Sequence, residues 1–228
     1  MHLTLRIFLL CLLLGTVSLY AQMEWGLKGG VGLSQITGYT RGSSSTYSVI
    51  PSPSAALGVY GQLGVGQRWQ LRSELLVSQV TDHYLIRFPF TDAWGNLTDQ
   101  FATTEIWRNA TYLSLPVLFG VRIRALDIFL GMQGSLALRS NGKDRILFPG
   151  NGEPVEFNNR YPSPIFRLFD AGPKASLQWH FAERFALEGS YYHGLMAIQQ
   201  APNYPWPFRV RQLLVGLQWQ ITKKQALP

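Results

Sequence analysis

The sequence has few charged residues and almost no cysteine, and both shortages exclude some classes of protein. The single cysteine, Cys11, excludes a disulfide framework and a cysteine-based zinc site. Charged residues make up only 14% of the 228 residues, and no basic run is longer than Lys223 and Lys224. Without a basic stripe, nucleic acid is not an expected partner despite the net charge of +7. We expect no metal ion and no cofactor.

Residues 1–21 differ in kind from the rest and are typical of a cleaved secretory signal peptide. Arg6 supplies a positive start, residues 7–14 form a nearly unbroken apolar run, and Ala21 precedes the expected cleavage site. Cys11 lies inside the apolar run and follows large residues, which argues against a lipoprotein. The mature protein is therefore expected outside the cytoplasm.

Long apolar runs are missing from the rest of the chain, where none reaches the about 18 residues of a membrane-spanning helix. Instead, apolar and polar residues alternate with period two, which predicts β-strands with two unlike faces. In the last such segment, Leu213 and Leu217 alternate with Gln218 and Gln220, and Leu214 is the one apolar exception. The pattern recurs in eight segments: 24–34, 57–65, 69–78, 112–122, 127–138, 169–181, 185–192 and 212–221.

The polar face of these segments distinguishes a soluble sandwich or barrel from a membrane barrel. A soluble domain would carry Lys and Glu there, whereas this face holds mainly Gly, Ser, Gln and Tyr. Small and hydrogen-bonding side chains suit the narrow lumen of a barrel whose apolar face meets lipid. We therefore predict an all-β fold, an eight-stranded antiparallel transmembrane β-barrel over residues 22–221, followed by a short periplasmic tail, 222–228.

The links between the segments alternate strictly between short and long. Outer-membrane barrels show this asymmetry, with short periplasmic turns and longer extracellular loops. The sequence therefore predicts a location in the outer membrane of a Gram-negative bacterium, with both termini periplasmic. The short links are 66–68, 124–126 and 182–184, and the long ones are 37–54, 87–103, 140–167 and 200–208.

Aromatic residues on the apolar face gather at the short-turn and terminal ends of the segments. Trp and Tyr belts mark membrane interfaces, so we interpret this set as a girdle at one interface. Trp107 and Phe169 are candidates for the opposite girdle. The predicted girdle consists of Trp25, Trp69, Trp179, Phe181, Phe185 and Trp219.

Three short motifs carry a family resemblance. Residues 26–34 (GLKGGVGLS), 112–118 (YLSLPVL) and 169–172 (FDAG), in this order, resemble strands of the PorT-like outer-membrane β-barrel family of Bacteroidetes. The similarity extends over the whole mature chain and implies an eight-stranded barrel, with a link to type IX protein secretion through the founding member. One departure is the end of the chain: such barrels often end on an aromatic residue, whereas here a tail follows Trp219 and Ile221.

Alternation directs both basic and acidic side chains into the predicted lumen. Because an eight-stranded barrel is only just wide enough for its own side chains, we interpret these charges as a paired polar plug. A narrow small-solute channel remains the alternative. The predicted lumen network consists of Lys28, Arg72, Glu74, Arg122, Asp170, Lys174 and Glu188.

Some small outer-membrane barrels are enzymes that modify lipid A, and a hydrolase of this kind would need a histidine paired with a serine and a carboxylate. Outside the predicted signal peptide the histidines are His83, His180 and His193, and only His193 has a serine and a carboxylate nearby, Ser190 and Glu188. Alternation points Ser190 and Glu188 to the lumen and His193 to lipid, and the other two histidines sit singly. We therefore predict no enzyme, with a lipid A-modifying enzyme kept as an alternative.

Function is then expected in the loops of a monomeric barrel. Loop 140–167 and loop 200–208 are rich in proline and aromatic residues, as partner-binding loops often are, and 38–54 holds six serines. Packing of the loops over the barrel mouth explains these residues equally well. We predict a scaffold or accessory protein, with type IX secretion as the specific hypothesis. Its expected partners are outer-membrane lipid and lipopolysaccharide, together with a secretion-system or surface protein.

Overall fold

A computed structural model describes residues 23–37, 46–91, 97–148, 154–161, 169–196 and 209–222. The predicted signal peptide and all of the tail beyond Thr222 lie outside the described residues. No helix among the described residues is long and apolar enough to span a membrane. The strands are β1 (Met23–Thr37), β2 (Thr46–Val65), β3 (Trp69–Thr91), β4 (Leu97–Ile123), β5 (Leu126–Leu147), β6 (Val155–Tyr161), β7 (Phe169–His180), β8 (Phe185–His193) and β9 (Arg209–Gln220).

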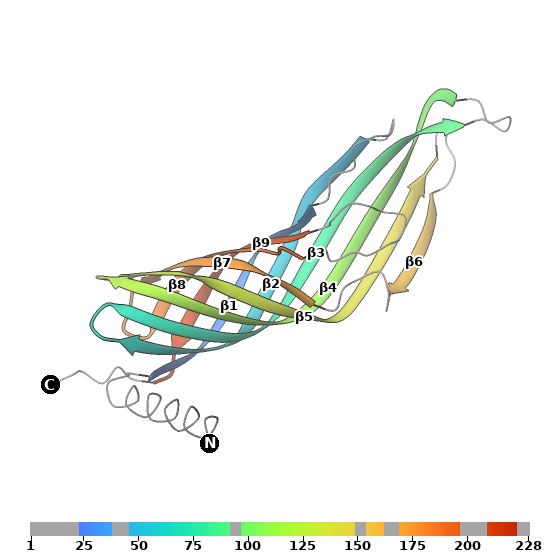
Figure 1. The fold of residues 1–228 in the computed structure, drawn as a ribbon. Helices are drawn as coiled ribbons and strands as arrows, with labels where there is room; N and C mark the ends of the chain where they lie inside the picture. Colours follow the sequence, from blue (N-terminus) through green and yellow to red (C-terminus); the bar gives the residue numbers. More distant parts are fainter. Residues whose placement is uncertain are drawn as a thin grey trace, which may run out of the picture.

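The strands form a closed antiparallel ring (Figure 1). Each strand from β1 to β5 pairs with the next along the chain, and β7 to β9 do the same. The ring closes because β9 pairs with β1 and β5 pairs with both β4 and β7. β6 pairs only with β5 among the described residues, beyond the point where β7 leaves it. The predicted all-β antiparallel fold is confirmed, and β6 is a strand that the sequence pattern did not reveal.

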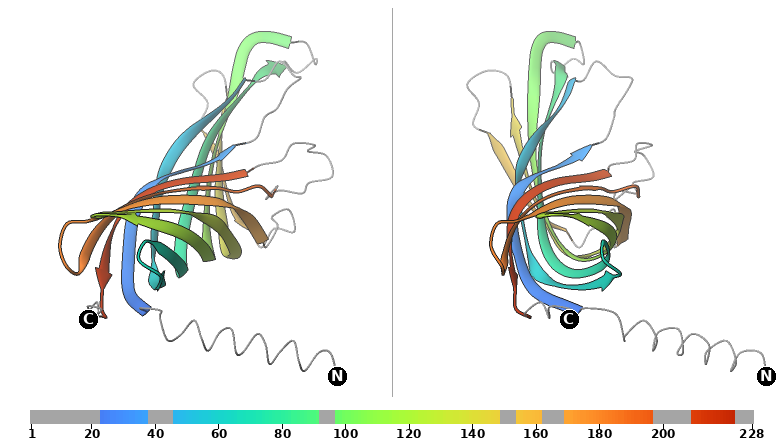
Figure 2. Two further views of the ribbon diagram at one scale, coloured as in Figure 1. Left: turned by 60° about the vertical axis from the view of Figure 1, so that its left-hand side comes forward. Right: turned by 90° about the vertical axis from the view of Figure 1, so that its left-hand side faces the viewer.

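Both chain ends of the ring meet at the end with the short turns. The backbone N–H of Trp25 donates to Thr222 Oγ1 at 2.8 Å, which ties the start of β1 to the end of β9. Gly66 and Arg124, in two of the short turns, have φ values of 69° and 56°, as tight hairpin turns require. Figure 2 shows that β1 starts and β9 ends at this end of the ring.

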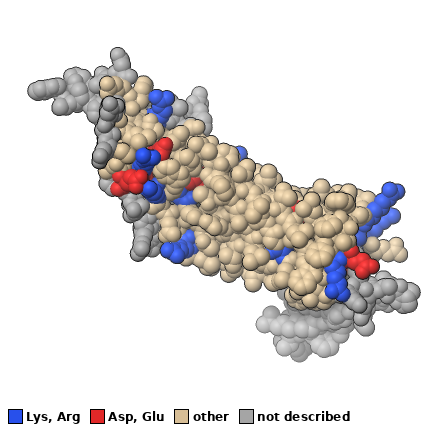
Figure 3. Space-filling model, turned by 180° about the vertical axis from the view of Figure 1, so that it is seen from behind, with Lys and Arg blue, Asp and Glu red and all other residues tan. Residues whose placement is uncertain are grey.

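The outer surface around the middle of the ring is apolar. On β3, Leu75 is 46% exposed whereas its neighbour Glu74 is 2% exposed, so apolar side chains point outward and polar ones inward. Figure 3 shows a broad middle zone with few charged side chains, which instead gather toward the two ends. On β4, the outward apolar residues run from Leu113 to Ile123, a height of about 25 Å for a tilted strand. A band of this height matches the hydrocarbon layer of a bilayer.

β2 to β5 continue far beyond the apolar band. They have 20, 23, 27 and 22 residues, against 12, 9 and 12 for β7, β8 and β9. Together with β6 they form a sheet that projects from the end opposite the short turns (Figures 1 and 2). We call the projecting part of these strands the extension; it comprises residues 46–51, 82–91, 97–109, 139–147 and 155–161.

The prediction that three of the long links are loops is wrong, because strands of the extension occupy much of them. Much of 37–54, 87–103 and 140–167 is strand, because β2 begins at Thr46, β3 reaches Thr91 and β5 reaches Leu147. The sequence signal was hidden because the two faces change character here. On β4, Ala102 and Ile106 in the extension are buried and point inward, whereas the inward residues in the membrane part of the barrel are mainly polar. An apolar inner face and a polar outer face are what a sheet in water requires.

We predict that inward glycines are essential to the curvature of the ring. A Cβ at Gly58 would collide with the main-chain oxygen of Leu75, whereas a Cβ at Gly189 would meet nothing within 4 Å. Gly58→Ala should therefore lower the free energy of unfolding by roughly 1–3 kcal/mol, and Gly189→Ala should leave it nearly unchanged. Urea titration of the protein folded into lipid vesicles measures both. Equal stability of the two variants would contradict the prediction.

Candidate functional site: the charged lumen

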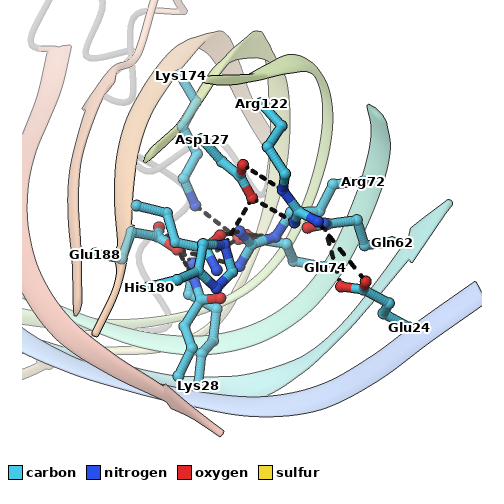
Figure 4. Close-up of polar contacts among 12 residues, drawn as sticks. Glu24, Lys28, Gln62, Arg72, Glu74, Arg122, Asp127, Lys174, His180 and Glu188 are labelled. Carbon is cyan, nitrogen blue, oxygen red and sulfur yellow. Dashed lines mark hydrogen bonds and ion pairs between the residues drawn. The ribbon is translucent and has the colours of Figure 1, made fainter. Parts of the chain in front are cut away.

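The structure places the seven predicted lumen residues on the inner face of the ring (Figure 4 shows six of them). They come from β1, β3, β4, β7 and β8, so strands on opposite sides of the barrel contribute. Arg72, Glu74, Lys174 and Glu188 are all at most 4% exposed. Charges this deeply buried are tolerated only when they are paired and hydrogen-bonded.

The central cluster joins three cations to two carboxylates. Lys28 Nζ lies 2.9 Å from Glu74 Oε1 and 2.7 Å from Glu188 Oε1. Arg72 bridges the same pair, with Nε 2.9 Å from Glu74 Oε1 and Nη2 3.1 Å from Glu188 Oε2. Lys174 Nζ lies 3.0 Å from Glu74 Oε2. Both carboxylates therefore contact more than one cation, which ties β1, β3, β7 and β8 together across the lumen.

Uncharged neighbours complete the surroundings of Arg72. Its Nη1 donates to Gln178 Oε1 at 2.8 Å, and its guanidinium lies 4.6 Å from the centre of the Tyr60 ring and 5.2 Å from that of Phe129. Gln218 Nε2 donates to Glu188 Oε2. Cation–π contact and neutral donors offset the loss of water around the buried charges.

A second cluster lies at the short-turn end. Arg122 donates from Nε and Nη2 to the two oxygens of Asp127, both at 2.8 Å, in a bidentate pair. Asp127 Oδ2 is also 2.8 Å from His180 Nε2. Arg122 Nη1 approaches Glu24 Oε1 at 4.0 Å, and Gln62 Nε2 donates to Glu24 Oε2 at 3.5 Å. This end of the lumen is thus closed by its own ion pairs.

Sequence reasoning missed three members of the second cluster. Glu24 and Asp127 occupy inward positions of the alternation, so their side of the strand was readable, but they were not counted among the lumen charges. The interpretation of His180 as a lone histidine is wrong, because it contacts Asp127. That contact joins β7 to the start of β5 and depends on strand register, which alternation does not reveal.

Asp170 is inward but stands apart from both clusters. Tyr192 Oη donates to its Oδ2 at 2.8 Å, and the backbone N–H of Met196 donates to its Oδ1 at 3.2 Å. Among the described residues no Lys or Arg forms an ion pair with it. The structure therefore brings six of the seven predicted residues into ion pairs and places Asp170 in a separate hydrogen-bonded site.

The lumen beyond the central cluster is filled by smaller groups. Ser114 Oγ lies 3.4 Å from Ser78 Oγ and 2.9 Å from Ser135 Oγ, and an apolar cluster follows toward the extension. Three small cavities between the central cluster and the apolar cluster measure about 20, 10 and 10 Å³, and a cavity of that size holds roughly one water molecule. The lumen described here is packed rather than open. The apolar cluster consists of Val80, Ala110, Tyr112, Tyr192 and Val210.

The described part of the chain shows no catalytic triad around its histidines. His193 lies on the outer face, where its Nδ1 is 3.2 Å from Tyr191 Oη, whereas Glu188 and Ser190 are buried inside. His83 stacks on Trp107 with ring centres 4.8 Å apart. Among the described residues, no group of three or more His, Cys, Asp or Glu could hold a metal ion.

The residues of the predicted girdle are between 39% and 52% exposed. Trp69 stacks on Phe119 with centroids 5.1 Å apart, and Phe181 lies 5.9 Å from Trp179 and 6.4 Å from Phe185. They lie at the short-turn end of their strands and so form an aromatic edge to the apolar band. Of the two candidates for the opposite girdle, Phe169 is 48% exposed, and Trp107 is less exposed, on the extension.

Comparison with known proteins identifies the family. The model of the outer membrane protein beta-barrel domain matches residues 20–200. The chain belongs to this family. It is therefore an outer-membrane β-barrel protein, as the closed ring and its apolar band require. The match is to the general domain.

Two solved structures resemble this chain at low sequence identity. The attachment invasion locus protein Ail of Yersinia pestis, solved with the heparin analogue sucrose octasulfate, is 11% identical, with a TM-score of 0.43, and covers 88% of this chain and 99% of its own. Neisserial surface protein A is 8% identical, with a TM-score of 0.36, and covers 87% and 97%. No curated protein matches the sequence.

We predict that the central cluster contributes more to the free energy of unfolding than an exposed ion pair does. Glu74→Gln leaves Lys28, Arg72 and Lys174 facing Glu188 alone, and removing one partner of a buried pair typically costs about 3–5 kcal/mol. The control is Glu156→Gln, which removes an exposed partner of Lys143 in the extension and should not change stability measurably. Urea unfolding in vesicles compares the two. A Glu74 variant as stable as the parent would contradict the prediction.

We also predict that the barrel does not conduct. Because the described lumen is packed from the second cluster to the apolar cluster, purified protein in planar lipid bilayers should give no stepwise ion currents. Glu74→Gln, refolded under the same conditions, provides a comparison in which the plug is weakened. Regular single-channel steps from the parent protein would show that a path exists.

Proposed function

We propose that this protein is a non-enzymatic scaffold that holds the extension at the cell surface. The observation that carries the proposal is the contrast between a lumen packed with ion pairs and a sheet that continues far beyond the membrane band. A packed lumen offers no route for a solute, and the outward position of His193 leaves Ser190 and Glu188 without a base. What remains available to partners is the projecting sheet and the loops at its end.

The orientation proposed is with the short turns in the periplasm and the extension outside the cell. Short periplasmic turns and longer outer segments are the rule among such barrels. The extension is suited to water, since its outer face carries Asn109, Lys143 and Glu156. Both termini then lie in the periplasm.

The extension has the features of a recognition surface. Its outer face carries ion pairs, with Lys143 Nζ 2.9 Å from Glu156 Oε2 and Arg145 within 4.0 Å of Glu105 and Glu156. The hydrogen bond from Lys143 lowers the pKa of Glu156, which keeps this carboxylate charged. Among the described residues, β6 pairs only with β5, so its other edge carries backbone groups that could pair with a partner strand.

The specific hypothesis is an accessory role in type IX protein secretion, supported by the resemblance of 26–34 and 112–118 to the PorT-like family. A secretion system needs outer-membrane components that bind other proteins rather than catalyse a reaction. A packed barrel with a large projecting sheet fits such a component.

The first test compares a deletion strain with its parent by quantitative proteomics of culture medium and periplasm. An accessory role in secretion predicts that exported proteins accumulate in the periplasm and disappear from the medium. Unchanged medium would exclude the secretion role and leave surface recognition as the function to examine.

A second test uses a shortened variant to determine whether the extension is required for function. Thr81 and Asn109 are directly opposed on β3 and β4, so 82–108 can be replaced by an Asn-Gly turn that keeps the barrel register. We expect the shortened protein to reach the outer membrane but fail to complement the deletion. Complementation equal to that of the full chain would show that the extension is dispensable.

A further inference from the structure

The outer face of β1, β9 and β8 changes from apolar to polar along one register line. Leu33, Leu213 and Tyr191 are mutual neighbours across the three strands and are 49%, 53% and 42% exposed. Two residues farther from the short turns, the next outward row is Gln35, Arg211 and His193. This row lies near the upper edge of the apolar band, and Leu195, two residues beyond His193, is a further exposed apolar residue.

Arg211 is a cation without a counter-ion among the described residues. Its neighbours on the strand, Val210 and Gln212, are 2% and 5% exposed and point inward, so Arg211 points outward. Its Nε is fully buried and has no hydrogen-bond partner in the described part of the chain. The residue as a whole is only partly buried, and the two Nη groups of a guanidinium can bind a phosphate in a bidentate way.

His193 and Gln35 flank Arg211 with further hydrogen-bonding groups. His193 Nδ1 lies 3.2 Å from Tyr191 Oη; in the tautomer in which Nδ1 accepts this bond, Nε2 carries a proton that can be donated to an anion. The outward positions of β1, β8 and β9 carry no carboxylate in the described residues. Asp170, the acidic group nearest in the wall, points inward and accepts from Tyr192.

The apolar band has a gap directly below this row. Gly189 lies four residues from His193 on β8, about 13 Å toward the short turns. Three other outward glycines are covered, since a Cβ at Gly29, Gly61 or Gly134 would touch Leu57, Trp25 or Phe169. A Cβ at Gly189 would touch nothing within 4 Å, so among the outward glycines of the described strands Gly189 alone leaves open space for a lipid chain.

We propose that this face binds one phosphorylated glycolipid of the outer leaflet, of the lipid A class. A phosphate would lie on Arg211, with His193 and Gln35 beside it, and an acyl chain would lie over Gly189. Arg211 and Gly189 are close enough for the phosphate and an acyl chain of one lipid molecule to reach both. The inference rests on the proposed orientation, in which this edge of the band faces the outer leaflet.

Arg139 provides a matched control. It is an exposed arginine on the outer face of β5, next to Leu138 at the same edge of the band, but the outward glycine below it, Gly134, is covered by Phe169. Arg139→Gln therefore removes the same charge at the same interface where no gap exists. Arg211→Gln and Gly189→Leu alter the two halves of the proposed site separately.

The test is native mass spectrometry of the full mature protein in detergent micelles. Each variant is titrated with diphosphorylated lipid A, with the same lipid after removal of its phosphates, and with phosphatidylglycerol. We expect retention of one diphosphorylated lipid A by the parent and by Arg139→Gln, and roughly tenfold weaker retention by Arg211→Gln, because a charge-assisted contact is lost. Gly189→Leu should also weaken retention, and circular dichroism confirms that each variant is folded.

Equal losses in Arg139→Gln and Arg211→Gln would overturn the proposal, since the effect would then be one of general charge. Equal retention of the dephosphorylated lipid, or of phosphatidylglycerol, would overturn the assignment to lipid A. Because retention is measured in micelles, it does not depend on orientation. Labelling of intact cells at a cysteine introduced in the extension, at Asn141, tests orientation separately. Loss of lipid retention therefore contradicts the lipid site alone, and absence of labelling contradicts the proposed surface role.

Discussion

Backbone hydrogen bonding inside the bilayer is the constraint on which this structure depends. Hydrocarbon offers no partner to an exposed N–H or C=O group, so a sheet can cross it only as a closed ring. The pairing of β9 with β1 over Gly26–Thr37 supplies that closure. Closure with so few strands leaves a narrow interior, and the side chains that fill it must satisfy one another because water has little access.

The ion clusters provide these mutual contacts inside the lumen. Lys28 and Glu188 are 160 residues apart and Arg72 and Glu188 are 116 apart, so each contact joins distant strands across the lumen. Buried pairs of this kind add little net stability compared with well-packed apolar groups, but they penalise any register that separates them. In a barrel whose wall is held only by neighbouring strands, such contacts favour one arrangement of opposite walls.

Above the membrane band the physical problem reverses. The extension stands in water, so its inner face is apolar around Ala102 and Ile106 and its outer face carries exposed ion pairs. The same strands therefore have a polar interior at one end and an apolar interior at the other. This change divides the molecule into a packed anchor and a projecting sheet, and it separates the part that holds the protein in the membrane from the part that partners can reach.

Period-two alternation was sufficient to predict the eight strands of the ring, their lipid-facing side and the inward direction of residues such as Arg72 and Glu74, but not β6. It also located the three short turns, whereas much of three of the predicted long links is strand. These features are local, because the direction of a side chain in a strand follows from its position in the sequence alone. Alternation did not predict the long reach of β3 and β4, because both faces change character where the strands leave the membrane.

Only the tertiary structure decided which charges meet. The pairing of His180 with Asp127, the separation of Asp170 from the basic residues and the row formed by Gln35, Arg211 and His193 all depend on how strands are shifted against one another. The sequence by itself determined the membrane barrel and the two faces of its wall. Register between strands that are far apart in the chain determined the clusters, because a shift of one strand changes every neighbour across the lumen while leaving its own alternation intact.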